Sequence, residues 1–134
     1  LRARYATLVF EFQPGPVHGD AHVANLMRRI SGETILIDLE TLCHGPREWD
    51  LCLPAGYLRR FNWIPRADYR EFTTAYGFDI LNWPGFSVMA AVRELTMTTW
   101  LLQLATSNTA ARREFDTRVH DLRCETYPRR WTAF

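Results

Sequence analysis

Polar side chains of the kinds that carry catalysis are concentrated in two short segments of the chain. The first segment reads HGDAHVAN, residues 18–25, and the second contains Asp38 and Glu40. An amide and a carboxylate are oxygen ligands that suit a hard cation such as Mg²⁺. A further carboxylate beside them could accept a proton from an attacking hydroxyl. Such a set fits phosphoryl transfer, because that chemistry consists mainly of positioning and charge neutralisation.

A predicted β-hairpin should bring the two segments together. Apolar runs at 26–30 and 34–39 flank a Ser-Gly pair at 31–32, and the glycine supplies the positive φ that a two-residue turn needs. With that turn, Asn25 lies opposite Asp38 on the same side of the ribbon. The Cβ atoms of opposed residues are roughly 5 Å apart. The hairpin therefore predicts that these two side chains share one cation.

Asp20 is the candidate base, because it lies on the loop that enters the first strand and reaches the same pocket. Asp38 stands in the apolar segment TILIDLE, residues 34–40, where a carboxylate is costly unless it is paired or binds a metal. The interpretation depends on the strand register, since a shift by one residue turns a side chain to the other face.

The rest of the chain is predicted to be mainly helical. The apolar spacing predicts an opening helix that Pro14-Gly15-Pro16 ends, and further helices over 47–61, over 66–76, after Pro84-Gly85 and over 109–125. The inner face of the last helix is expected to carry Ala111, Phe115, Val119 and Leu122. Trp131 and Phe134 could hold the C-terminus against the core. The expected fold class is α+β, mainly α with short β-hairpins.

Composition limits the functions that are open to the chain. Its 134 residues fit one domain, and its formal net charge of +1 suggests neither nucleic-acid binding nor a membrane surface. The sequence contains no lysine, so amine chemistry is not available from this chain. The 3 cysteines, without a CxxC spacing, are expected to be free thiols, which indicates a cytoplasmic protein.

The segments HGDAHVANLM, ILIDLE and GPREWDL resemble the aminoglycoside phosphotransferase and choline kinase family, a branch of the protein-kinase-like fold. The resemblance is strong over 17–51 and weaker over 69–104. It implies an ATP-dependent and Mg²⁺-dependent enzyme that transfers a γ-phosphoryl group to a hydroxyl of a small molecule. Residues 1–134 would then be the C-terminal lobe of such a kinase, with the catalytic loop and the acceptor site.

The resemblance also implies a role for each matching residue. Asp20 matches the catalytic base, and Asn25 and Asp38 match the two metal ligands. His18 and Asp50 match residues that brace the catalytic loop. His22 and Glu40 are expected in the second shell of the metal. Glu94 and Trp100 are expected at the acceptor cleft.

The nucleotide-binding N-terminal lobe of the family is not found in this sequence, which has neither a GxGxxG motif nor a lysine. Either the chain is a fragment, or that lobe comes from another chain, or the protein has lost it, and the isolated chain is expected to be inactive or incomplete. An uncovered lobe should expose an apolar face and self-associate. The expected partners are that lobe and a small-molecule hydroxyl acceptor, with no nucleic acid and no membrane.

Several alternatives remain at this point. His18, Asp20 and His22 could form the HxDxH cluster of a zinc-type hydrolase. The chain could also be a non-catalytic half-kinase that acts as a binding module. Among single features, Asp50 could merely cap a helix, and Arg93 and Glu94 could be an ordinary surface pair. The pairs Arg112-Arg113 and Arg129-Arg130 are expected to lie on solvated faces.

Overall fold

The computed structural model describes residues 1–134, which form helices and two small antiparallel sheets. The α-helices are α1 (Arg2–Ala6), α2 (Glu48–Arg59), α3 (Arg66–Tyr76), α4 (Phe86–Leu104) and α5 (Thr109–Cys124). The strands are β1 (Gly15–Val17), β2 (Leu26–Arg28), β3 (Thr34–Leu36) and β4 (Cys43–Gly45). Short 3-10 turns are η1 (Val23–Asn25), η2 (Leu39–Thr41) and η3 (Ile80–Asn82). The mixed α+β class is confirmed.

The four helices predicted after residue 46 are present, with bounds close to those expected, because local signals mark their ends. Helix α3 follows Pro65 and stops at Gly77, whose φ of 83° is the left-handed conformation that glycine favours. Helix α5 begins after Asn108, whose side chain accepts hydrogen bonds from the backbone N–H groups of Ala110 and Ala111. No helix has both the length and the hydropathy needed to span a membrane.

The opening helix is shorter than its apolar spacing predicts. It covers only Arg2–Ala6, and the following residues run without regular structure to β1. The buried carboxylate of Glu48 in α2 accepts hydrogen bonds from the backbone N–H groups of Glu11 and Phe12, at 2.7 and 2.9 Å. Contacts with α2 therefore replace helical hydrogen bonds in this segment.

The β2–β3 hairpin forms, but its predicted register is wrong by one residue. Leu26 lies opposite Leu36 and Arg28 opposite Thr34. Arg29 N–H donates to the carbonyl of Glu33 at 2.8 Å, so the loop contains three residues rather than two. A turn followed by a left-handed glycine is the usual form of a three-residue hairpin loop, and Gly32 has φ 87°.

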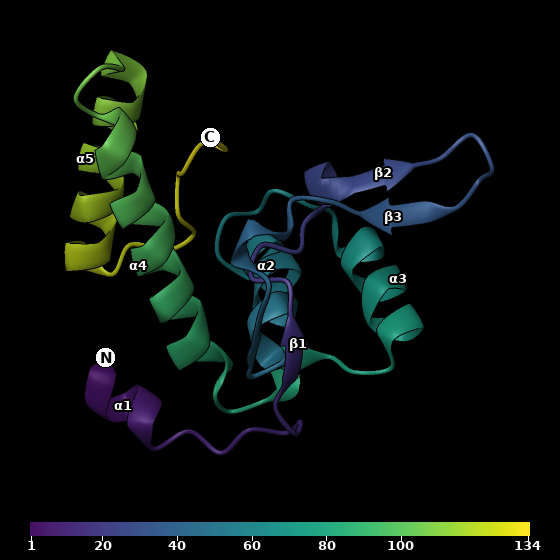
Figure 1. Ribbon diagram of the computed structural model, residues 1–134. Coiled ribbons are helices and arrows are strands. Elements are labelled where there is room, and N and C mark those ends of the chain that lie inside the picture. The colour runs from purple at the N-terminus through teal and green to yellow at the C-terminus, as the bar shows by residue number, and fades with distance from the viewer.

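The main core is built by α2, α3, α4 and η3. Its buried members are Leu51, Cys52, Ala55, Tyr69, Ile80, Trp83, Phe86, Met89 and Ala90. In Figure 1, α2 occupies the centre, α4 and α5 lie side by side at one side, and the β2–β3 hairpin projects from the other. Strands β1 and β4 pair antiparallel, with Val17 opposite Cys43, and hold the ends of the 18–42 segment together.

The inner face of α5 differs from the prediction. Ala111 is buried, but the other buried residues of this helix are polar: Glu114, Arg118 and Asp121. The predicted apolar residues Phe115, Val119 and Leu122 are only half-buried. The polar face is buried because the C-terminal segment covers it: Thr132 donates two hydrogen bonds to the Glu114 carboxylate, and Arg118 donates one to the Thr132 carbonyl.

The C-terminal segment is held by one of its two aromatic residues. Trp131 is 3% exposed, as expected, whereas Phe134 is 52% exposed and does not pack into the core. Arg129 was expected on a solvated face and is instead buried, with its guanidinium 2.9 Å from the carboxylate of Glu94. Arg112 does lie on the surface, where it pairs with Asp116.

Candidate phosphotransferase site

The candidate site begins with a loop that the first turn of α2 holds in place. Both oxygens of the Asp50 carboxylate accept backbone hydrogen bonds, from His18 N–H at 2.7 Å and from Gly19 N–H at 2.9 Å. Trp49 Nε1–H donates to the carbonyl of Gly19 at 2.8 Å. Asp50 does not cap its own helix, so that alternative is wrong. Two consecutive helix residues thus fix the backbone that precedes Asp20.

The ring of His18 ties this loop to the segment after β3. Its Nδ1 accepts a hydrogen bond from Asp20 N–H, so Nε2 carries the proton and donates to the carbonyl of Ile37 at 2.9 Å. Ile37 N–H in turn donates to the carbonyl of Asn25 at 2.9 Å. Both backbone polar groups of Ile37 are therefore held by the HGDAHVAN segment, directly before Asp38.

The Asp20 carboxylate contacts the side chains of Arg93 and His22 and is also open to solvent. Arg93, from α4, places Nη2 3.2 Å from Asp20 Oδ1, and His22 places Nε2 3.4 Å from Asp20 Oδ2. The Asp20 side chain is nevertheless 48% exposed. A carboxylate that is oriented and still accessible has the properties that a general base needs.

The structure does not place Asn25 and Asp38 face to face across the hairpin. The register sets Asn25 opposite Ile37, and Asp38 lies beyond β3 with a left-handed backbone, φ 63° and ψ 63°. Asp38 is exposed, so the argument from a costly buried carboxylate also fails. Glu40, in η2, is exposed as well. What links Asp38 to the loop is the pair of hydrogen bonds at the neighbouring Ile37, one of which continues the β2–β3 pairing, and not a pairing of Asp38 with Asn25.

The amide of Asn25 is oriented by the loop itself. Asn25 is 8% exposed, and its Nδ2 donates to the carbonyl of Asp20 at 2.9 Å. This contact leaves Oδ1 as the atom available to a ligand. An amide oxygen and an accessible carboxylate at Asp38 are hard oxygen donors, so the donor types fit Mg²⁺.

The zinc-hydrolase alternative does not agree with the geometry. Both ring nitrogens of His18 are engaged in hydrogen bonds within the protein. No group of three or more His, Cys, Asp or Glu side chains is arranged to hold a metal ion. His18, Asp20 and His22 therefore do not form a three-ligand zinc site.

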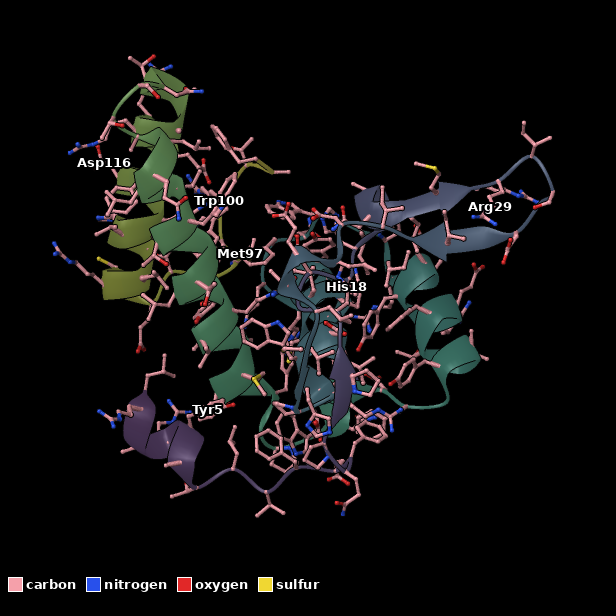
Figure 2. The ribbon with its side chains drawn as sticks, viewed as in Figure 1. Tyr5, His18, Arg29, Met97, Trp100 and Asp116 are labelled. Carbon is pink, nitrogen blue, oxygen red and sulfur yellow. The ribbon has the colours of Figure 1, made fainter.

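A pocket of about 780 Å³ opens beside Asp20, between α2, α4 and the C-terminal segment. Trp100 and Met97, both from α4, line it (Figure 2). Glu94 does not line it, because its carboxylate is buried against Arg129. The expectation for Glu94 is therefore wrong.

Sequence reasoning missed the part that Arg93 plays. The alternative that Arg93 and Glu94 form an ordinary surface pair is wrong, because both are buried and they bind different partners. Arg93 donates to the Gly19 carbonyl, and its guanidinium lies 4.7 Å from the ring centroid of Trp49. The sequence does contain a signal for this role, because Arg93 and Glu94 stand together in an otherwise apolar helical stretch. Charged residues in such a stretch are buried only when they have a partner.

Two pKa shifts accompany this arrangement. Burial lowers the pKa of the Arg93 guanidinium, and the carboxylates of Asp20 and Asp50 oppose that effect. Burial raises the pKa of the Tyr57 phenol, and the nearby Asp20 carboxylate raises it further. Tyr57 is thus a neutral hydroxyl on the wall of the pocket at neutral pH.

Comparison with known proteins identifies a family for the chain. Searches of curated proteins and of solved structures give no match. A family model described as the phosphotransferase enzyme family matches residues 1–95, which include the HGDAHVAN segment, Asp38 and Asp50. Because the match extends over more than half of the 134 residues, the chain belongs to the phosphotransferase enzyme family.

Proposed function

We propose that the chain forms the catalytic part of a small-molecule kinase, which transfers the γ-phosphoryl group of ATP or another nucleoside triphosphate to a hydroxyl. The observation that carries the proposal is the Asp20 carboxylate, held by Arg93 and His22 and open to the pocket. The family match supports the same reaction class. The proposed fold is the C-terminal lobe of a protein-kinase-like enzyme.

In this proposal Asp20 orients the acceptor hydroxyl and accepts its proton as the new bond to phosphorus forms. Arg93 holds Oδ1, which leaves Oδ2 and its exposed side for the substrate. His22, 3.4 Å from Oδ2, is a positioning residue. His18 and Asp50 brace the loop so that Asp20 does not need to reorganise during the reaction.

Asn25 and Asp38 are the proposed metal ligands, through the amide Oδ1 and the carboxylate. Bound Mg²⁺ would neutralise charge on the nucleotide phosphates. His18 and Asn25 fix the backbone of Ile37 and so set the position of Asp38. Glu40 lies two residues after Asp38. We propose that it contacts the metal ligands and not the metal itself.

A partner lobe is proposed to cover the hairpin and bring the nucleotide. Large apolar side chains are exposed on and around β2 and β3: Val23, Leu26, Met27, Ile30, Leu36, Leu39 and Leu42. Apolar groups gathered on one projecting element favour burial against another surface. When that lobe is absent, the same side chains favour self-association of the chain.

The experiment that tests the metal assignment is titration of the chain with Mn²⁺, followed by electron paramagnetic resonance, with and without ATP. The proposal predicts binding that ATP strengthens and that Asp38→Asn weakens about tenfold or more. The matched control is Glu33→Gln, an exposed acid on the same hairpin, which should leave binding unchanged. Equal binding by Asp38→Asn and the parent chain would contradict the assignment, as would tight binding of zinc alone.

A further inference from the structure

The pocket beside Asp20 is mainly apolar. Eleven of the 15 residues that line it are hydrophobic. Its aromatic members come from separate parts of the chain: Tyr57, Trp63, Trp100, Trp131 and Phe134. Apolar walls with a few directional polar groups are typical of sites that bind small organic molecules.

The ionic groups of this pocket are already paired within the protein. Asp20 is its single acidic residue and contacts Arg93 at 3.2 Å. Arg118 is its single arginine and contacts the Glu114 carboxylate at 2.8 Å. The Tyr57 hydroxyl is neutral at neutral pH, and burial raises its pKa further. The walls therefore present almost no net charge to a ligand.

The aromatic surface at Trp131 is also occupied by cations of the protein. The guanidinium of Arg118 lies 4.9 Å from the ring centroid of Trp131, and that of Arg129 lies 5.6 Å from it. Both guanidinium groups are already in contact with this ring, which a cationic ligand would otherwise use. A cationic ligand is thus disfavoured on the side where an aromatic face would otherwise attract it.

The C-terminal wall is rigidly attached and lies outside the family match. The match ends at residue 95, whereas Trp100 and residues 131–134 follow it. Trp63 Nε1–H donates to the Trp131 carbonyl at 2.9 Å, and Thr132 binds the carboxylate of Glu114. Figure 1 shows this last segment running between α4 and α2. Seven of the 15 lining residues therefore come from the part of the chain that the family match does not cover.

We propose that this pocket takes the phosphoryl acceptor and selects an uncharged alcohol with a broad apolar body, rather than a polyamine or a polar polyol. This inference rests on the proposed function, since Asp20 is the group that the acceptor hydroxyl must reach. Trp100 and Phe134 form the exposed aromatic walls, which makes them specificity-determining residues. A polycation would find one acid, already paired with Arg93.

Isothermal titration calorimetry with the full chain tests the inference without nucleotide or metal. The probes are naphthylethanol, naphthylethylamine, which has the same body with a cationic head, and inositol, a neutral polar polyol. Naphthylethanol should bind at least about tenfold more tightly than the other two, a difference of about 1.4 kcal/mol. Trp100→Ala and Phe134→Ala should each weaken naphthylethanol binding about fivefold to tenfold.

The control variant is Leu102→Ala, which removes an exposed apolar side chain of α4 that does not line the pocket. It should bind naphthylethanol like the parent chain. Tighter binding of naphthylethylamine or inositol would overturn the inference, as would unchanged naphthylethanol binding in both aromatic variants. Because Trp100 and Phe134 are about half exposed, their variants should keep the circular dichroism of the parent chain.

The two proposals fail in different ways. Phosphate transfer to inositol, without naphthylethanol binding, would overturn the acceptor class and leave the kinase assignment intact. Naphthylethanol binding that depends on Trp100, in a chain that transfers phosphate to no alcohol even when mixed with a nucleotide-binding lobe of the same family, would support the pocket and overturn the proposed function. Asp20→Asn should keep naphthylethanol binding, because the apolar walls supply most of the contact area.

Discussion

The guanidinium of Arg93 lies 3.2 Å from the carboxylate of Asp20, although 73 residues separate them in the sequence. The same guanidinium donates to the Gly19 carbonyl and is 6% exposed. Arg93 of α4 and Trp49 of α2 thus donate to the same carbonyl of the proposed catalytic loop. The site depends on this long-range contact as much as on its own motif.

Replacing Arg93 with methionine should destabilise the protein by about 2 kcal/mol, because the buried guanidinium loses its ion pair with the half-exposed Asp20 carboxylate and its hydrogen bond to the Gly19 carbonyl. Arg112→Met should cost less than about 0.5 kcal/mol, since Arg112 pairs with Asp116 on the surface. Urea denaturation of both variants measures the difference. Equal midpoints would show that Arg93 contributes no more than a surface pair.

Asp50→Asn should destabilise the loop, because an NH₂ group would face one of the two backbone N–H donors of His18 and Gly19. The expected loss is about 2 kcal/mol in the free energy of unfolding. Asp116→Asn, at an exposed position, serves as the matched control. Amide hydrogen exchange at Gly19 should accelerate in Asp50→Asn only; unchanged exchange would contradict the bracing contact.

Gly19→Ala and Gly32→Ala separate backbone strain from steric conflict. Both glycines have a positive φ, 89° and 87°, but a Cβ at Gly19 would lie 2.6–2.9 Å from atoms of Thr41, whereas one at Gly32 meets nothing within 4 Å. Gly32→Ala should cost about 1 kcal/mol and Gly19→Ala more than about 3 kcal/mol. Thermal unfolding tests this order, and similar losses would refute it.

Cys52 should resist alkylation in the folded protein. Burial raises the pKa of its thiol from 9.0 to about 12, against a smaller opposing effect of Arg93. At about pH 9, where exposed thiols are substantially ionised, iodoacetamide should label Cys43 and Cys124 and leave Cys52 unmodified. Mass spectrometry of the peptides reads the result, and labelling of Cys52 at the rate of Cys43 would contradict it.

The same shift predicts a stability change in alkali. The pKa of the Cys52 thiol in the folded state lies above its ordinary value of 9.0. The stability that this difference contributes is therefore fully present below pH 9.0. This contribution is lost as the pH rises from 9.0 through about 12, when the unfolded thiol ionises first. Cys52→Ala should show a smaller loss of stability over that range, as measured by urea denaturation.

The helices could be predicted from the sequence because their signals are local. Proline, glycine and capping residues mark the ends of α3, α4 and α5, and apolar periodicity marks their bodies. The HGDAHVAN and ILIDLE motifs also identified the family correctly, through resemblance, over residues that the family match includes.

The register could not be predicted, because a Ser-Gly pair fits both a two-residue and a three-residue loop. The structure uses Ile30 as a third loop residue, which shifts every pairing by one. The polar contacts at Arg93, Glu94 and Arg129 were also misjudged. Arg93 pairs with Asp20 across 73 positions of the sequence and Glu94 with Arg129 across 35. A helical pattern does not indicate which charged group finds such a distant partner.

The most direct test of the account is phosphate transfer from γ-labelled ATP with Mg²⁺ to naphthylethanol and to inositol. The chain is tested alone and mixed with a nucleotide-binding lobe of the same family. The account predicts transfer that Asp20→Asn reduces at least about 100-fold while Glu33→Gln leaves it unchanged. Transfer that survives Asp20→Asn, or no transfer under any of these conditions, would contradict it.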